Sequence, residues 1–214
     1  MTRKRFWDDP YLTTLDTVVA DVSGDDVTVA ETILYAFSGG QESDAGTIGG
    51  RAVLAARKEG LDIVYTLDRA DGLAPGDAVR QELDWPRRYA LMRLHFAAEL
   101  VLELATRQSP GIEKIGAHIA ADKARIDFLW ERSLAAALPD LADAANALIA
   151  ADHPIASAFS DEAAQRRYWE IAGFARVPCG GTHLRRTGEV GPLALRRKNV
   201  GKHKERIEIS LAAR

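Results

Sequence analysis

The sequence has little of what marks secreted, membrane or low-complexity proteins. It contains a single cysteine, Cys179, in 214 residues, which excludes an internal disulfide and favours a reducing compartment. No apolar run approaches the roughly 20 residues needed to cross a bilayer, and the longest candidate, 134–151, is interrupted by Pro139, Asp140 and Asp143. The basic N-terminus lacks the apolar segment of a signal peptide. We therefore expect a cytoplasmic protein without membrane partners.

The composition that is present is globular, but its charge is unevenly distributed. Hydrophobic residues make up 47% and charged residues 28%, enough for cores in one large or two small domains. The net charge is −3, yet residues 185–206 hold eight Lys or Arg against two acidic residues. Such a stretch is typical of a surface that binds a polyanion, and equally of a solvated pair of charged strands.

The pattern changes character near Trp85-Pro86. Before it, short apolar segments separated by turn glycines predict a small β-barrel; after it, apolar residues at three- and four-residue spacing predict a helix over 86–107. The fold class is therefore α+β, with an N-terminal barrel domain (1–85) and an α+β domain (86–214) of antiparallel sheet and packed helices. The predicted strands are 15–21, 27–31, 51–58, 61–66, 78–83, 112–119, 124–130, 192–198 and 206–211, and the further helices are 140–152 and a short one after Ser160.

Two pairs of metal-ligating side chains share the same spacing. His95 and Glu99 lie four residues apart on the predicted helix, so both point from one face. Cys179 and His183 are also four apart, with two glycines between them that suit a tight turn. Imidazole, thiolate and carboxylate together are the ligand set of zinc. Each pair alone also occurs on solvated helix faces or in ordinary turns, so spacing leaves both interpretations open.

These residues lie in segments that resemble a known family. The segment Val177-Pro-Cys-Gly-Gly-Thr-His-Leu184 resembles the signature of the editing domain shared by alanyl- and threonyl-tRNA synthetases and by the free-standing AlaX proteins. The glycine-rich segment 34–46 resembles a motif of the domain that precedes the editing domain in alanyl-tRNA synthetase. The resemblance covers nearly the whole chain, and the length fits the medium-sized AlaX class. Further similar segments, in family order, are 83–89, 92–95, 124–128 and 187–192.

The resemblance implies a hydrolase that cleaves the ester joining serine, with glycine as a second candidate, to tRNA for alanine. The family binds zinc through His-x-x-x-His and Cys-x-x-x-His, and His95, Cys179 and His183 match those positions. Glu99 stands where the second histidine is expected. It is either the fourth zinc ligand, or a general base beside three ligands and an open water position, or the mark of a lost metal site.

The chemistry suggests further candidate residues. An aminoacyl ester is reactive enough to need no Ser or Cys nucleophile, and zinc ligation would occupy the thiolate of Cys179. A site that hydrogen-bonds the serine hydroxyl would discriminate against alanine, and Thr182 and His118 are candidates for that contact.

Gly39, Gly40 and Gln41 are interpreted either as a backbone wall over the pocket or as a turn between barrel strands. Candidates for contacts to the tRNA acceptor end are Arg185, Arg186, Arg196, Arg197, Lys198, Lys202 and Lys204.

Two other functions fit the same sequence. The departure at Glu99 would suit an enzyme that edits a different mischarged tRNA. It would also suit a tRNA-binding module whose metal site has degraded and which has no catalytic activity. The sequence predicts neither the oligomeric state nor the means of recognising tRNA identity.

Overall fold

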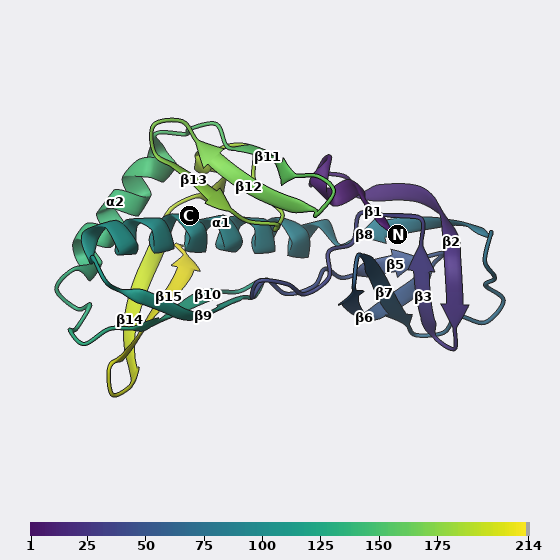
Figure 1. Cartoon of the computed structure of the whole chain (residues 1–214), viewed down its shortest axis with the longest axis horizontal. Helices are drawn as coiled ribbons and strands as arrows, with labels where there is room; N and C mark the ends of the chain where they lie inside the picture. The colour runs from purple at the N-terminus through teal and green to yellow at the C-terminus, as the bar shows by residue number, and fades with distance from the viewer. Residues whose placement is uncertain (213–214) are drawn as a thin grey trace. The chain divides into compact units, whose positions relative to one another are not determined.

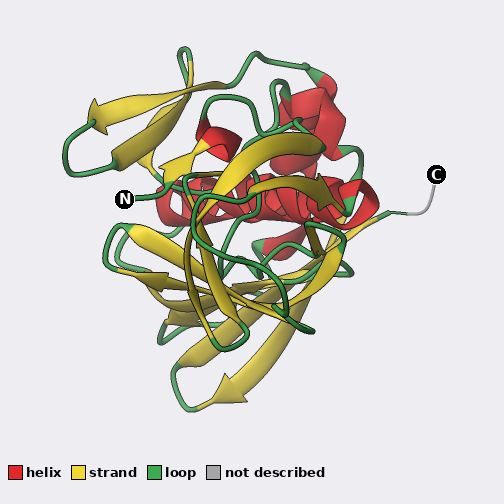
Figure 2. Cartoon of the chain, turned by 90° about the vertical axis from the view of Figure 1, so that its right-hand side faces the viewer, coloured by secondary structure: helices red, strands yellow, loops and turns green. Residues whose placement is uncertain are grey.

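The computed structural model describes residues 1–212 and has the predicted α+β architecture (Figures 1 and 2). By its internal contacts the chain divides into two compact units. Unit 1 comprises Met1–Ser38 and Glu42–Tyr89, and unit 2 comprises Gly39–Gln41 together with the chain from Ala90 onward. The assignment of editing to residues 86–214 stays a prediction.

Unit 1 is a closed barrel with strand order β2-β3-β7-β6-β5-β8. Its side chains alternate between core and solvent along β3 and β8, as expected for strands with one buried face. A short parallel pair, β1 (Arg3–Lys4) and β4 (Glu31–Thr32), and the 3-10 turn η1 (Arg5–Trp7) complete the unit. The barrel strands are β2 (Thr14–Ser23), β3 (Asp26–Val29), β5 (Gly46–Ile48), β6 (Arg51–Glu59), β7 (Asp62–Leu67) and β8 (Ala78–Leu83).

A buried ion pair connects two segments of unit 1. The side chains of Arg88 and Asp44 are both inaccessible to solvent, and the Arg88 guanidinium contacts the Asp44 carboxylate in a two-pronged arrangement. Arg88 also donates to the carbonyl oxygens of Pro10 and Ile33, at 2.9 and 2.6 Å, and Asp44 accepts from the Tyr35 backbone amide at 2.6 Å. The pair therefore joins the glycine-rich segment to the first turn of the long helix.

Unit 2 is built around helix α1 (Trp85–Gln108), whose first turn belongs to unit 1. Figure 1 shows α1 between two antiparallel sheets, of order β14-β15-β10-β9 and β11-β12-β13. Because α1 is covered from both sides, its buried residues form a broad surface rather than a narrow stripe. The remaining elements are β9 (Glu113–Ile119), β10 (Ala124–Leu129), α2 (Leu138–Ala150), β11 (Ala156–Asp161), β12 (Arg166–Ile171), β13 (Ala175–Pro178), η2 (Thr187–Val190), β14 (Leu193–Gly201) and β15 (Lys204–Leu211).

The predicted short helix after Ser160 is wrong. Ser160 lies in β11, and the following residues form a turn in which the Ala164 amide donates to the Asp161 carboxylate at 2.9 Å. Ser160 and the two acidic residues after it resemble a helix cap, but the same side chains also stabilise turns. The alternating burial of Arg167, Trp169 and Ile171 belongs to a strand.

The last hairpin turns later than predicted. Strands β14 and β15 continue to Gly201 and Lys204, so Asn199 is a strand residue and the turn contains Lys202 and His203. His203, in this turn, has a positive φ of 57°. Among the described helices, none combines the length and hydropathy needed to cross a bilayer.

Candidate metal centre and editing pocket

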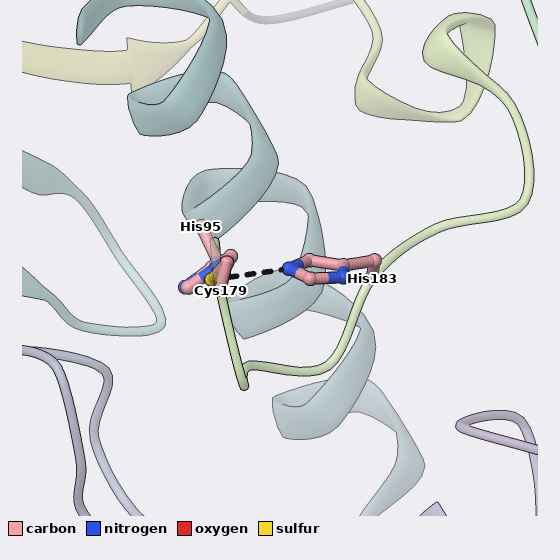
Figure 3. Close-up of side chains that lie close together, drawn as sticks. All are labelled: His95, Cys179 and His183. Atoms are coloured by element: carbon pink, nitrogen blue, oxygen red, sulfur yellow. Dashed lines mark hydrogen bonds between the residues drawn. The ribbon is translucent and has the colours of Figure 1, made fainter. Parts of the chain in front are cut away.

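Three predicted ligands converge in unit 2. The Sγ atom of Cys179 lies 3.3 Å from Nε2 of His95 and 3.3 Å from Nε2 of His183, and the three ligand atoms are all within 4.8 Å of one another. Figure 3 shows Cys179 beside the imidazole of His95 on α1, with His183 reaching in from the following loop. A tetrahedral zinc with bonds of about 2.0–2.1 Å to nitrogen and about 2.3 Å to sulfur separates N and S by roughly 3.6 Å. The observed spacings fit such an ion.

Backbone geometry explains why the cysteine meets the helix. The Cys179 amide donates to the Arg167 carbonyl at 2.9 Å, which continues the β12–β13 pairing by one residue beyond Pro178. A Cβ on Gly181 would lie 2.7 Å from Nε2 of His95. The backbone bends at Gly181, and neither Gly180 nor Gly181 has a positive φ. Gly181 is needed instead for close approach to His95.

Electrostatics at this cluster favours a bound cation. Burial lowers the pKa of His95 and holds that of His183 well below its ordinary value, so both imidazoles are neutral and keep a lone pair for a metal. Burial, helped by the Glu99 carboxylate, raises the pKa of the Cys179 thiol. A divalent cation would reverse this last effect, because metal coordination removes the thiol proton.

The outer nitrogen of His183 is fixed by a serine. Ser157 Oγ lies 3.0 Å from Nδ1 of His183, which leaves Nε2 directed at Cys179. Such outer partners orient metal-binding imidazoles, and their loss costs about 10- to 100-fold in metal affinity.

We therefore expect Ser157→Ala to weaken zinc binding by about 10-fold without unfolding the chain. Competition titration with a chromophoric chelator measures the change. Ser160→Ala, on the same strand but bonded only to the Arg166 carbonyl, is the matched control. Equal zinc affinities for the two variants would contradict an orienting role for Ser157.

Glu99 contacts two of the three members of this cluster. Its Oε1 is 3.4 Å from Cys179 Sγ and 3.6 Å from His95 Nε2, yet Glu99 falls outside the set of ligand atoms that are mutually within 4.8 Å. Its other oxygen accepts a hydrogen bond from the buried Trp169 indole at 3.2 Å. The carboxylate is thus held on the side of the cluster formed by His95 and Cys179.

The predicted pocket residues Gly39, Gly40 and Gln41 group with unit 2 rather than with the barrel. The Ile119 amide donates to the Gly40 carbonyl at 2.7 Å, so this segment lies along the end of β9. Gly40 has a φ of 87°, and a Cβ there would lie 2.5 Å from the Ala117 carbonyl oxygen. Glycine is therefore required at this position. The adjacent Gln41 side chain donates to Thr182 Oγ1 at 3.0 Å, and both side chains are buried.

The orientation of strand β9 decides which of its side chains face the candidate metal centre. His118 pairs with Arg125 across the sheet, and strand alternation directs it away from the face of Ala117 and Ile119. Lys114, which sequence reasoning did not select, lines a small cavity with His95 and Glu99. A register shift in the β9–β10 pairing places Lys114 on that face, and no sequence signal indicates the shift.

Several of the predicted tRNA-binding side chains already have acidic partners. Arg197 donates to both carboxylate oxygens of the buried Glu205, at 2.5 and 2.6 Å, and Lys198 contacts Glu208 at 2.7 Å. Arg186 contacts Asp152 at 2.7 Å. Arg186 and Lys198 are nevertheless exposed, as are Arg185, Arg196, Lys202 and Lys204.

Comparison with known proteins agrees with this geometry. Residues 170–208, which contain Cys179 and His183, match the family model described as the threonyl and alanyl tRNA synthetase second additional domain. The chain is 30% identical to the alanyl-tRNA editing protein AlaX-M of Pyrococcus horikoshii, over 99% of this chain and 98% of that protein. It is 30% identical to AlaX-M of Methanosarcina acetivorans, over 99% of each chain. It is also 33% identical to an alanine–tRNA ligase of Ignicoccus hospitalis, over 91% of this chain and 24% of that enzyme. The chain belongs to the AlaX-M family of alanyl-tRNA editing proteins.

Proposed function

We propose that this chain, an aminoacyl-tRNA deacylase by family, hydrolyses the ester between serine and tRNA for alanine, with glycine as a second misacylated substrate. The observation that carries the proposal is the convergence of His95, Cys179 and His183 beside the buried Gln41–Thr182 hydrogen bond. Two neutral imidazoles and a thiol provide the donors for a metal, and the amide and hydroxyl provide polar contacts for a substrate. The partner is the aminoacylated acceptor end of tRNA.

Zinc is the ion that this donor set suits best. His95, Cys179 and His183 would hold it, and when bound it supplies a Lewis acid that polarises an oxygen or lowers the pKa of a water. Cys179 serves better as a ligand than as a nucleophile, because burial and the Glu99 carboxylate both raise the pKa of its thiol. The protein residues bind the aminoacyl group and exclude bulk water from the ester.

For Glu99 we favour a role beside the metal rather than on it. A fourth tetrahedral ligand would lie within about 3.6 Å of every other ligand atom, whereas Glu99 falls outside the set of atoms mutually within 4.8 Å. The Trp169 indole donates to Oε2 of Glu99 at 3.2 Å, a hydrogen bond that does not depend on the proton of the Cys179 thiol and that holds the carboxylate at the edge of the site. From there it can take a proton from the attacking water as a general base.

We expect Glu99→Gln to lower kcat by about 10²- to 10⁴-fold, the usual contribution of a positioned general base, while zinc content stays near that of the unmodified chain. Single-turnover deacylation and elemental analysis measure the two quantities. Glu103→Gln, one turn further along α1 and paired with Arg107, is the control. Loss of zinc from Glu99→Gln, but not from Glu103→Gln, would instead make Glu99 a ligand.

The function itself is tested by a deacylation panel. Purified protein is incubated with seryl-, glycyl- and alanyl-tRNA for alanine, and with seryl-tRNA for serine as a control for tRNA identity. We expect rapid release of serine from the first and little from the correctly charged species. No hydrolysis of any substrate by zinc-loaded protein would favour a non-catalytic tRNA-binding module. Hydrolysis of another mischarged tRNA alone would reassign the substrate.

The exposed basic residues are proposed contacts to the acceptor-end phosphates. Each phosphate contact releases counterions, so binding should weaken steeply as salt concentration rises. Lys202 and Lys204 lie in and beside the turn of the final hairpin, and Arg185 and Arg196 are also exposed, so these four are accessible to RNA.

A further inference from the structure

The side chain of Gln41 carries a buried polar atom without a partner. Gln41 is inaccessible to solvent, and its amide nitrogen donates to Thr182 Oγ1 at 3.0 Å. Its carbonyl oxygen, Oε1, has no hydrogen-bond partner. A buried acceptor left unpaired is destabilising, so its retention calls for an explanation such as a ligand that donates to it.

The position of this oxygen connects it with the candidate metal centre. A Cβ built on Gly181 would lie 3.0 Å from Gln41 Oε1 and 2.7 Å from His95 Nε2. Both atoms therefore pack closely against Gly181, which leaves no room for a side chain there and brings Oε1 of Gln41 near the imidazole of His95. Thr182 follows Gly181 directly in the chain.

The segment that carries Gln41 is held firmly in place. Gly40 approaches the Ala117 carbonyl so closely that no other residue fits, and its own carbonyl accepts from the Ile119 amide at 2.7 Å. Gln41 is bridged to Ile119 in the parallel sense. Because the backbone is fixed on β9, the amide is preorganised, and little conformational freedom is lost when a ligand binds.

We propose that Oε1 of Gln41 accepts a hydrogen bond from the side-chain hydroxyl of the misacylated serine, and that Gln41 thereby determines the specificity of editing. This inference rests on the proposed function and extends it by naming the atom that recognises serine.

The hydrogen bond between Gln41 and Thr182 adds a second point of recognition. Since Thr182 Oγ1 accepts from the Gln41 amide nitrogen, its own hydroxyl proton is directed elsewhere. It can donate to the serine oxygen while that serine donates to Oε1. Alanine offers neither a donor nor an acceptor, so binding alanine leaves both protein groups unpaired. A site of this kind can favour serine over alanine by up to about 10⁴- to 10⁵-fold, whereas an apolar pocket cannot.

The first test is Gln41→Met, which keeps the length of the side chain and removes both polar atoms. The measured quantity is the ratio of kcat/KM for seryl-tRNA(Ala) to that for alanyl-tRNA(Ala). We expect this ratio to fall by about 10²-fold. Gln108→Met, at an exposed position at the end of α1, is the matched control and should keep the ratio.

The outcomes separate this inference from the proposed function. If the unmodified chain deacylates seryl-tRNA(Ala) and Gln41→Met slows both substrates equally, Gln41 contacts a group common to all aminoacyl esters, such as the α-amino group, and the inference is overturned. If the unmodified chain deacylates neither substrate, the proposed function fails, and binding to the analogues described next decides the inference.

The second test uses the unmodified chain, so it holds even if Gln41→Met does not fold. Adenosine carrying a seryl, alanyl or 3-fluoroalanyl group through a 3′-amide is not hydrolysed, and its Kd can be measured by calorimetry. Fluorine is close to a hydroxyl in size but cannot donate a proton. We expect the seryl analogue to bind at least about 10-fold more tightly than the fluoroalanyl analogue. Equal affinities would overturn the assignment of Oε1 as the acceptor.

Discussion

Cys179→Ser is expected to abolish stable zinc binding and to reduce seryl-tRNA(Ala) deacylation by well over 10²-fold. The thiol is the central donor of the cluster, 3.3 Å from each imidazole nitrogen. A serine hydroxyl is a harder and far less acidic donor than a thiol, so it does not replace the thiolate. Since loss of an outer-sphere partner already costs about 10- to 100-fold, loss of a direct ligand should cost more.

Zinc content by elemental analysis and deacylation rate measure the two effects. The unmodified chain treated with a chelator should lose activity to the same extent and recover it on addition of zinc, whereas the variant should not recover. Because Cys179 is the only cysteine in the chain, no other thiol can replace it. Full zinc content together with complete inactivity would point to a nucleophilic cysteine, and full activity would contradict the metal site.

The second large effect is expected in the buried ion pair of unit 1. Asp44→Ala leaves the Arg88 guanidinium buried without its counter-ion, and breaking a buried pair in this way costs about 3–5 kcal/mol. For a chain of this size, that corresponds to a fall in Tm of roughly 6–20 °C. Arg88 keeps its two backbone carbonyl acceptors, but these carry no full negative charge.

Thermal and urea unfolding measure this change. Asp16→Ala is the matched control in the same barrel, because the Asp16 side chain is 82% exposed and its ion pair with Arg80 is long, at 4.0 Å. This variant should change the free energy of unfolding by less than about 1 kcal/mol. The double variant Asp44→Ala/Arg88→Met should be more stable than Asp44→Ala alone, because it removes the unpaired charge. A loss below about 1 kcal/mol in Asp44→Ala would show that water or backbone groups satisfy Arg88.

Much of the architecture was predictable because its signals are local. Glycine turns between short apolar segments predicted the barrel, and apolar spacing from residue 86 predicted α1. The sheet β11-β12-β13 was missed because Ser160 and its acidic neighbours resemble a helix cap, although Trp169 and Ile171 alternate as in a strand. Local chemistry gave the wrong result there because tertiary pairing decided the structure.

The functional residues likewise divide into those that the sequence indicates and those that only the folded chain brings together. The resemblance selected His95, Cys179 and His183, and the structure brings them together. It could not place Lys114 in the pocket, because that depends on a register shift in the β9–β10 pairing. Nor could it show that the Gln41 side chain meets Thr182, since these residues are 141 positions apart in the chain. Contacts of this kind follow from the complete fold rather than from any segment.

X-ray absorption at the zinc edge of the purified, zinc-loaded protein tests the central claim most directly. If His95, Cys179 and His183 hold the metal, the spectrum contains one sulfur at about 2.3 Å and two imidazole nitrogens at about 2.0–2.1 Å. A shell of light atoms alone, without sulfur, or protein that binds no zinc at all, would contradict the account.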